Sequence, residues 1–174
     1  MTQEFLSTAV LSPNWLIKIS LKMLDVGDKA PDFELLRDTG DSVSLDELLA
    51  GGALILYFYP ADFTPGCTVE ACDIRDMYPD IKAANASVVG VSPQSVQTHQ
   101  RFKSTFQLPF PLLADPQKMV IRSFGVNGPM DFGVRRVTFL INQDKWIADR
   151  VVADFAIKRH SRFIENVLDD LGGY

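Results

Sequence analysis

The sequence predicts a single α/β domain in which helices cover a central β-sheet. Two apolar runs without alternation, Ala53–Tyr59 and Ser87–Ser92, are typical of strands that are buried on both faces. The segment between them, Pro65 to about Ala83, has a helical pattern, so the three segments make a βαβ unit with parallel strands. The length of 174 residues, with 47% hydrophobic and 22% charged residues, fits one globular domain.

A β-hairpin and a short helix are expected before this unit. The stretch DFELLRDTGDSVSL, residues 32–45, predicts two short strands joined by a turn at 38–41, where Gly40 supplies the positive φ that turns need. Ser44 and Glu47 have the spacing of a capping box, and Gly51 and Gly52 mark the end of the helix that the box begins.

The segment after Ser92 is expected to add a helix, a short strand, a second helix, a hairpin and a closing helix. The first three are predicted at residues 94–107, 110–115 and about 118–124. The hairpin joins strands at 134–141 and 146–152, and the closing helix, about 157–171, has its apolar side chains on one face. The domain therefore has a βαβ half and a ββα half.

The first 22 residues form a predicted extension before a domain that spans residues 23–174. Polar residues and Pro13 interrupt the apolar residues of this extension, so neither a secretory signal nor a transmembrane span fits, and we expect a cytoplasmic protein without a membrane partner. Two interpretations stay open: a loosely held extension, or a short amphipathic helix at Trp15–Leu24 that docks on the domain or on a neighbour.

The charge pattern bears on the class of partner. The net charge is -5, and the 17 lysines and arginines are scattered along the chain. Nucleic-acid binding draws most of its non-specific free energy from clustered cations. We therefore expect neither DNA nor RNA as a partner.

The only two cysteines, Cys67 and Cys72, lie five positions apart, at the predicted start of the helix that follows a buried strand. Thr64 and Pro65 are predicted as the N-cap and first residue of this helix, because proline lacks the N–H that would have no partner there. Cys67 then occupies the third helical position, where the helix dipole and free backbone N–H groups favour a thiolate. Cys67 is thus a predicted nucleophile.

Helix geometry separates the two sulfurs. The Cα atoms of residues five apart in an α-helix are roughly 8.6 Å apart and on different faces, whereas a disulfide needs Cα atoms within about 7 Å. Cys67 and Cys72 therefore cannot bridge while the helix is intact, and their pairing requires a helical turn to unwind. A bond that forces local unfolding suits a catalytic cycle better than a structural link.

Two other interpretations of the cysteines are weaker. Buried, inert cysteines are common, but the position after a central strand and at a helix N-terminus disfavours that interpretation. A zinc site needs three or four ligands, and His99 and His160 lie in helical segments with no second ligand at metal spacing. We expect no metal, and we expect both histidines to be solvated helix residues.

The stretch PADFTPGC, residues 60–67, resembles the Pro-x-x-x-Thr-x-x-Cys signature of peroxiredoxins. The second cysteine five positions later is similar to the bacterioferritin-comigratory-protein or peroxiredoxin Q branch, an atypical 2-Cys type. The stretches GDKAPDFEL, FPLLADP and RRVTFLI also look like that branch, so the likeness covers Val26 to about Leu171. It implies a thioredoxin-like fold, with a central mixed β-sheet flanked by helices and an N-terminal β-hairpin.

The same resemblance implies a thioredoxin-dependent peroxidase that reduces hydrogen peroxide and organic hydroperoxides. Cys67 is then the peroxidatic cysteine and Cys72 the resolving one, while Pro60, Thr64 and Arg136 complete the catalytic site; Arg136 is chosen because it directly precedes the run VTFLI. The implied cycle forms a sulfenic acid, condenses it to an intramolecular disulfide, and restores both thiols with thioredoxin or a similar dithiol protein. The resemblance implies a monomer that needs no cofactor.

Two functions from other classes are weighed against this one. A thioredoxin-like disulfide reductase needs C-x-x-C at this helix, whereas the spacing here is C-x-x-x-x-C. A non-enzymatic binding module with the same fold would consume no peroxide.

Four residues near the predicted site have two interpretations each. Glu70 is expected as a surface carboxylate, with a proton acceptor or a pair to Arg136 as the alternative. Phe63, Met130 and Phe132 are expected in the core, with the lining of a path for apolar hydroperoxides as the alternative.

Overall fold

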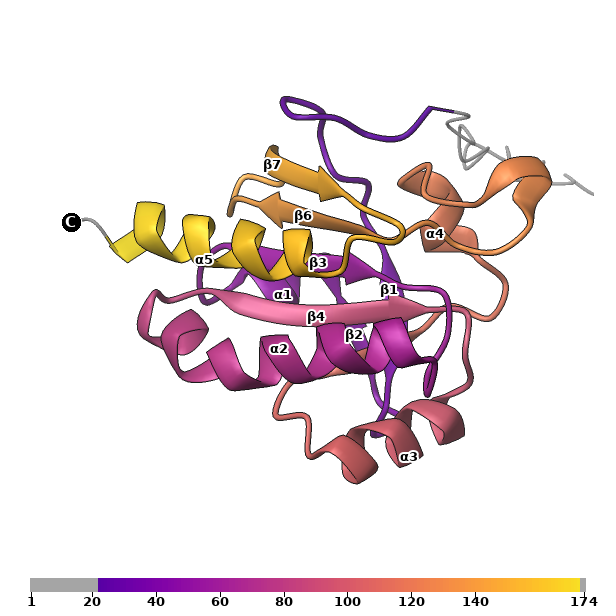
Figure 1. Cartoon of the computed structure of the whole chain (residues 1–174). Helices are drawn as coiled ribbons and strands as arrows, with labels where there is room; N and C mark the ends of the chain where they lie inside the picture. The colour runs from indigo at the N-terminus through magenta and orange to yellow at the C-terminus, as the bar shows by residue number, and fades with distance from the viewer. Residues whose placement is uncertain (1–21, 173–174) are drawn as a thin grey trace, which may run out of the picture.

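A computed structural model of the chain describes residues 22–172, which fold around one seven-stranded mixed β-sheet (Figure 1). The strand order is β2-β1-β5-β4-β3-β6-β7. The strands are Glu34–Arg37 (β1), Ser42–Ser44 (β2), Leu54–Phe58 (β3), Ser87–Ser92 (β4), Leu112–Ala114 (β5), Val137–Ile141 (β6) and Ile147–Val152 (β7). The helices are Leu45–Leu49 (α1), Pro65–Ala83 (α2), Val96–Phe106 (α3), Met119–Ser123 (α4) and Lys158–Gly172 (α5), with a 3₁₀ turn at Pro129–Asp131 (η1).

The predicted α/β class is confirmed, together with the N-terminal hairpin and the parallel central pair. Strands β3 and β4 are parallel and buried along their length, and β4 and β5 are also parallel. The hairpin strands β1 and β2 are antiparallel, and Ser44 caps α1 through the predicted capping box with Glu47. The sheet is therefore mixed, with parallel strands at its centre and antiparallel strands toward its edges.

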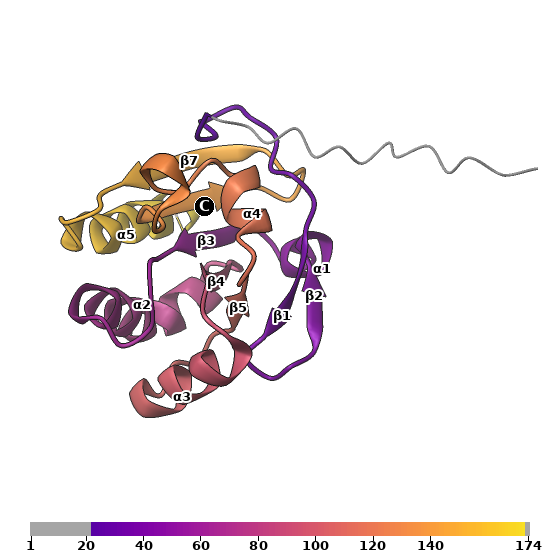
Figure 2. The same ribbon diagram turned by 90° about the vertical axis from the view of Figure 1, so that its right-hand side faces the viewer.

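The helices form two layers on opposite faces of the sheet (Figure 2). Helices α2, α3 and α5 pack on one face, around the buried side chains of Ile55, Phe102 and Ile164. Helices α1 and α4 pack on the other face, around Leu56 and Phe139. Each face of the central strands is thus covered, which explains why β3 and β4 are apolar without alternation.

The antiparallel pairing of β3 and β6 brings two distant segments of the chain together. Phe58, at the end of β3, is paired with Val137, at the start of β6. The residue before Val137 therefore lies beside the loop that leaves β3 and enters α2. This pairing places Arg136 next to the first turn of α2.

Most of the predicted extension lies outside the described residues, so the boundary at residues 22 and 23 and both interpretations of Trp15–Leu24 stay predictions. Within the described part, Leu24 donates its backbone N–H to the carbonyl of Phe124 at 3.1 Å. No helix between residues 22 and 172 is long and apolar enough to cross a bilayer.

Candidate active site

Cys67 lies in the first turn of α2, where the sequence places it. Thr64 is the N-cap residue with an extended backbone, and Pro65 is the first helical residue. The Thr64 hydroxyl makes no capping bond; it donates instead to the carbonyl of Ala61 at 3.1 Å, within the loop. The Cys67 side chain is buried, with 1% of the residue exposed. Its sulfur therefore sits near free N–H groups at the positive end of a 19-residue helix, away from bulk water.

Arg136 contacts the Cys67 sulfur directly. Its Nη2 donates a hydrogen bond to Cys67 Sγ at 3.2 Å, and the residue is 5% exposed. The neighbouring Arg135 points elsewhere and pairs with Asp154 at 3.0 Å. A guanidinium can approach this closely because residue 66 is glycine, since a Cβ there would lie 3.3 Å from Arg136 Nη2. The structure thus places Arg136, and not Arg135, beside the predicted nucleophile.

Glu70 is buried behind Arg136, so its predicted surface position is wrong. It is 1% exposed and forms an ion pair with Arg136 Nη1. The reason is helical spacing: Cys67, Glu70, Ala71 and Ile74 form the stripe of α2 that faces the sheet. Burial raises the pKa of Glu70 to about 7, and the positive charge of Arg136 opposes part of that rise.

His160 extends the same buried group, and its predicted solvation is also wrong. It is fully buried on α5, where its Nε2 lies 3.1 Å from the carbonyl of Ala153 and its Nδ1 lies 2.8 Å from the Thr138 hydroxyl. The carbonyl can only accept, so Nε2 carries the proton and Nδ1 accepts from the hydroxyl. Burial lowers the pKa of His160 to about 4, which keeps the ring neutral at pH 7.

Arg136, Glu70, His160 and Thr138 are called the arginine cluster below. Its members lie side by side from the sulfur inward, and His160 Nδ1 comes within 3.5 Å of Glu70 Oε1. Two of its buried atoms, Glu70 Oε1 and Arg136 Nε, have no hydrogen-bond partner among residues 22–172. The cluster therefore combines a buried ion pair with two buried polar atoms that have no hydrogen-bond partner in the described part of the chain.

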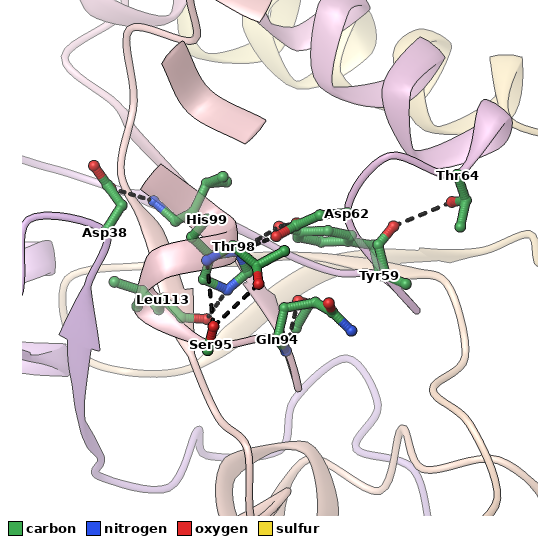
Figure 3. A network of polar contacts seen from close by, with 12 residues as sticks. Asp38, Tyr59, Asp62, Thr64, Gln94, Ser95, Thr98, His99 and Leu113 are labelled. Carbon is green, nitrogen blue, oxygen red and sulfur yellow. Dashed lines mark hydrogen bonds and ion pairs between the residues drawn. The ribbon is translucent and has the colours of Figure 1, made fainter. Parts of the chain in front are cut away.

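A second buried polar group, called the loop cluster, joins the segment between β3 and α2 to helix α3 (Figure 3). It consists of Tyr59, Asp62 and His99. The Tyr59 hydroxyl donates to Asp62 Oδ1 at 2.7 Å, and His99 Nδ1 lies 2.8 Å from Asp62 Oδ2. His99 Nε2 lies 3.2 Å from the carbonyl of Leu113 on β5. His99 is fully buried, which corrects the prediction that it is solvated.

Cys72 lies on α2 one and a half turns beyond Cys67 and is partly exposed. Both cysteines are free thiols, and α2 runs without a break from Pro65 to Ala83. This geometry agrees with the expectation that the two sulfurs are not joined while the helix is intact.

An open depression of about 1150 Å³ lies beside the sulfur site, lined in part by Pro60 and Arg136. Met130 and Phe132 are on its rim and are 98% and 87% exposed, so the core position predicted for them is wrong. Phe63 is 46% exposed, although its ring packs edge-on against Phe102 with centroids 5.2 Å apart. Met130 and Phe132 therefore line the depression next to Arg136, whereas Phe63 is not among its lining residues.

The structure thus brings four of the five predicted site residues to one place. Pro60, Thr64, Cys67 and Arg136 surround the first turn of α2, and Cys72 lies farther along the helix. Sequence reasoning missed the burial of both histidines, although the apolar residues three and four positions after His160, Phe163 and Ile164, place it on the inner face of α5.

Comparisons with known proteins agree on one family. The AhpC/TSA family model matches residues 26–150. Peroxiredoxin Bcp of Bacillus subtilis is 42% identical over 127 residues, which cover 70% of this chain and 80% of that protein. Peroxiredoxin Bcp of Escherichia coli is 37% identical over 153 residues, which cover 84% of this chain and 97% of that protein.

Solved structures give the same result. The crystal structure of peroxidoxin BcpB from Mycobacterium tuberculosis superposes with a TM-score of 0.79 and 36% identity, covering 87% of this chain and 98% of that one. A bacterioferritin comigratory protein of Xanthomonas campestris, described in terms of alkyl peroxide reduction and trapped intermediate and ligand complexes, superposes with a TM-score of 0.73 and 28% identity, covering 79% and 90%.

Proposed function

The chain belongs to the AhpC/TSA family of peroxiredoxins and is a thiol-dependent peroxidase, and we propose that Cys67 is the sulfur that attacks the peroxide. The observation that carries this proposal is the hydrogen bond of 3.2 Å from Arg136 to a buried Cys67 sulfur at a helix N-terminus. A cation and a helix dipole both stabilise a thiolate, which is the nucleophilic form of cysteine.

The first step breaks the O–O bond of the hydroperoxide. The Cys67 thiolate attacks one oxygen and forms a sulfenic acid, and the other oxygen takes up a proton and leaves as water or an alcohol. Arg136 stabilises the negative charge that develops on the leaving oxygen. The Thr64 hydroxyl precedes this turn, and because its own proton is donated to the carbonyl of Ala61, it can accept a hydrogen bond from the hydroperoxide. Pro60 on the rim limits the access of water to the sulfur.

The second step joins the two cysteines. The Cys72 thiol attacks the Cys67 sulfenic acid, a disulfide forms, and one water leaves. The helix that carries both residues is continuous, so its first turn opens before the sulfurs meet. Partial exposure of Cys72 fits a residue that moves toward its partner after this opening.

The family implies peroxide substrates and a thiol reductant. Thioredoxin or a similar dithiol protein is our proposal for that reductant, since it can attack the disulfide through a mixed disulfide. The exposed rim of Met130 and Phe132 supports alkyl hydroperoxides as substrates in addition to hydrogen peroxide, in line with the alkyl peroxide reduction named for the Xanthomonas campestris relative. A monomeric state and a cytoplasmic location complete the proposal.

The test is a count of free thiols, with intact mass, after one equivalent of hydrogen peroxide. The wild type should lose both thiols and about 2 Da, Cys72→Ser should stop at the sulfenic or sulfinic acid, and Cys67→Ser should keep Cys72 reduced. Survival of both thiols in the wild type would overturn the proposal and return the cysteines to a structural role.

A further inference from the structure

The loop that leads into the active site holds an unfavourable backbone shape. Phe63 has a φ of 61°, in the left-handed region that a bulky residue rarely adopts. Such a backbone conformation is unfavourable for a bulky residue and persists only where its surroundings hold it. Phe63 immediately precedes Thr64, the N-cap of α2, so the surroundings of this loop also determine where Thr64 and Cys67 lie.

Helix α3 supplies the contacts that hold the loop. Its His99 binds Asp62 at 2.8 Å, and its Phe102 and Phe106 pack against the Phe63 ring with centroid distances of 5.2 and 6.1 Å. The Asp62 and His99 side chains are both fully buried. The loop is therefore tied to α3 on one side by a buried polar pair and on the other by aromatic packing.

The polar pair is fully satisfied. The Tyr59 hydroxyl and the His99 ring occupy the two Asp62 oxygens, and the other ring nitrogen of His99 faces the carbonyl of Leu113 (Figure 3). Because both ring nitrogens face oxygen atoms, both contacts are hydrogen bonds only when Asp62 and His99 share one extra proton. Removing one partner would leave buried polar atoms without partners, and such a loss is costly.

The loop cluster contacts neither sulfur. Disulfide formation nevertheless requires the turn that this cluster holds to open. Asp62 lies five residues before Cys67, and the turn between them has to open for Cys72 to reach the sulfenic acid. We propose that Asp62 and His99 are positioning residues that hold the first turn of α2 in its peroxide-reactive shape. They thereby set how the Cys67 sulfenic acid divides between the disulfide with Cys72 and further oxidation. This inference rests on the proposed pairing of the two cysteines.

Two reactions compete for the Cys67 sulfenic acid, and each can be written with its products. In one, the sulfenic acid and the Cys72 thiol give a disulfide and water; in the other, the sulfenic acid takes an oxygen from a second peroxide and gives sulfinic acid and water or an alcohol. Further oxidation uses the folded turn, whereas the disulfide needs the open turn. A looser loop therefore favours the disulfide.

The test compares variants by intact mass after a pulse of excess hydrogen peroxide, with the rate of the first peroxide step measured in parallel. Asp62→Ala removes the tie to α3. Asp62→Asn keeps it, because the amide can accept from Tyr59 and donate to His99 Nδ1. Asp38→Ala is the matched control, since Asp38 is a buried carboxylate that tethers the same helix through Lys103 at 3.0 Å but lies away from the loop. Thermal midpoints are recorded for all three.

We expect Asp62→Ala to lower the sulfinic fraction and to slow the first peroxide step, each roughly tenfold. Asp62→Asn should stay near the wild type, and Asp38→Ala should lower the thermal midpoint without changing the sulfinic fraction. If Asp62→Ala does not fold, Tyr59→Phe removes only the hydroxyl that donates to Asp62 and should shift the fraction in the same direction.

Two results would overturn the inference: an unchanged sulfinic fraction in Asp62→Ala, or an equal shift in Asp38→Ala. A wild type that forms no disulfide would instead contradict the proposed function, so the two failures are distinguishable.

Discussion

Two buried polar clusters flank the first turn of α2, and both contain a carboxylate and a fully buried histidine. The arginine cluster contacts the Cys67 sulfur and leaves Glu70 Oε1 and Arg136 Nε without partners among the described residues. The loop cluster contacts no sulfur, and both carboxylate oxygens and both ring nitrogens of its Asp62 and His99 have partners. A buried polar network with every partner in place rigidifies its surroundings, whereas buried polar atoms without partners carry a cost in free energy.

The two histidines show the same difference. His99 lies against a carboxylate at 2.8 Å, while His160 accepts from a hydroxyl at 2.8 Å and stands 3.5 Å from Glu70. The arginine cluster thus places a buried carboxylate between a cation and a neutral ring. The peroxidase chemistry depends on the first cluster directly and on the second through the position of the loop.

The largest effect is expected from a substitution that breaks the contact between the arginine cluster and the Cys67 sulfur. Arg136→Lys keeps the positive charge but loses the planar fork that reaches Glu70 and Cys67 at once. We expect the rate constant of Cys67 oxidation by hydrogen peroxide, measured by stopped-flow fluorescence, to fall roughly 100-fold.

Arg135→Lys is the matched control, because Arg135 is adjacent in sequence but pairs with Asp154 at the surface. Its rate constant should stay within about threefold of the wild type. Equal losses in the two variants would show that the short contact with the sulfur is not what matters.

The second prediction concerns the buried charge of Glu70. Its pKa is raised from 4.5 to about 7 by burial, so the folded chain binds a proton more tightly than the unfolded chain does. The stability that this group contributes is therefore fully present below about pH 4.5 and is lost as the pH rises through 7. A shift of this size corresponds to about 3 kcal/mol.

Glu70→Gln removes this titration. The free energy of unfolding of the wild type minus that of the variant, from urea denaturation, should fall by about 3 kcal/mol between about pH 4.5 and 7. The difference is needed because His160, whose pKa is lowered to about 4, contributes with the opposite sign, and its stability is lost as the pH falls. A difference that stays constant between about pH 5 and 7 would mean that Arg136 holds Glu70 ionised throughout that range.

The smallest effect is expected from a substitution that displaces the Arg136 side chain without removing it. A Cβ at residue 66 would lie 3.3 Å from both Arg136 Nη2 and Ile157 Cδ1, so Gly66→Ala should displace the guanidinium by a few tenths of an ångström. The rate constant of Cys67 oxidation should fall roughly fivefold. Gly51→Ala, where a Cβ meets open space, should leave that rate constant unchanged; an unchanged rate in Gly66→Ala would mean that the arginine adjusts freely.

Short-range patterns predicted most of the fold. Continuous apolar runs marked β3 and β4, the spacing of Ser44 and Glu47 marked the cap of α1, and Thr64 with Pro65 marked the start of α2. Each signal depends on residues close in sequence, where periodicity and capping chemistry operate.

The polar interior could not be predicted with equal success. Glu70 pairs with a residue 66 positions away and Asp62 with one 37 positions away, and no local pattern encodes such a distance. A charged or imidazole side chain is usually exposed, so Glu70, His99 and His160 were expected in solvent. The spacing of Glu70 three residues after Cys67 was the one signal that placed it on the same face of α2.

Cys67 is expected to react with peroxide in a folded turn and to meet Cys72 only after that turn opens. Hydrogen exchange on the reduced protein and on its disulfide form tests this claim directly, in peptides that cover residues 61–72. The first turn of α2 is reported by the backbone N–H groups from residue 68 onward, which bond to the carbonyls of that turn, beginning with Thr68 to Thr64 at 2.9 Å. Their protection should be high in the reduced protein and lost in the disulfide form, while peptides from β3 and β4 keep their protection. Equal protection of that turn in both forms would contradict the account.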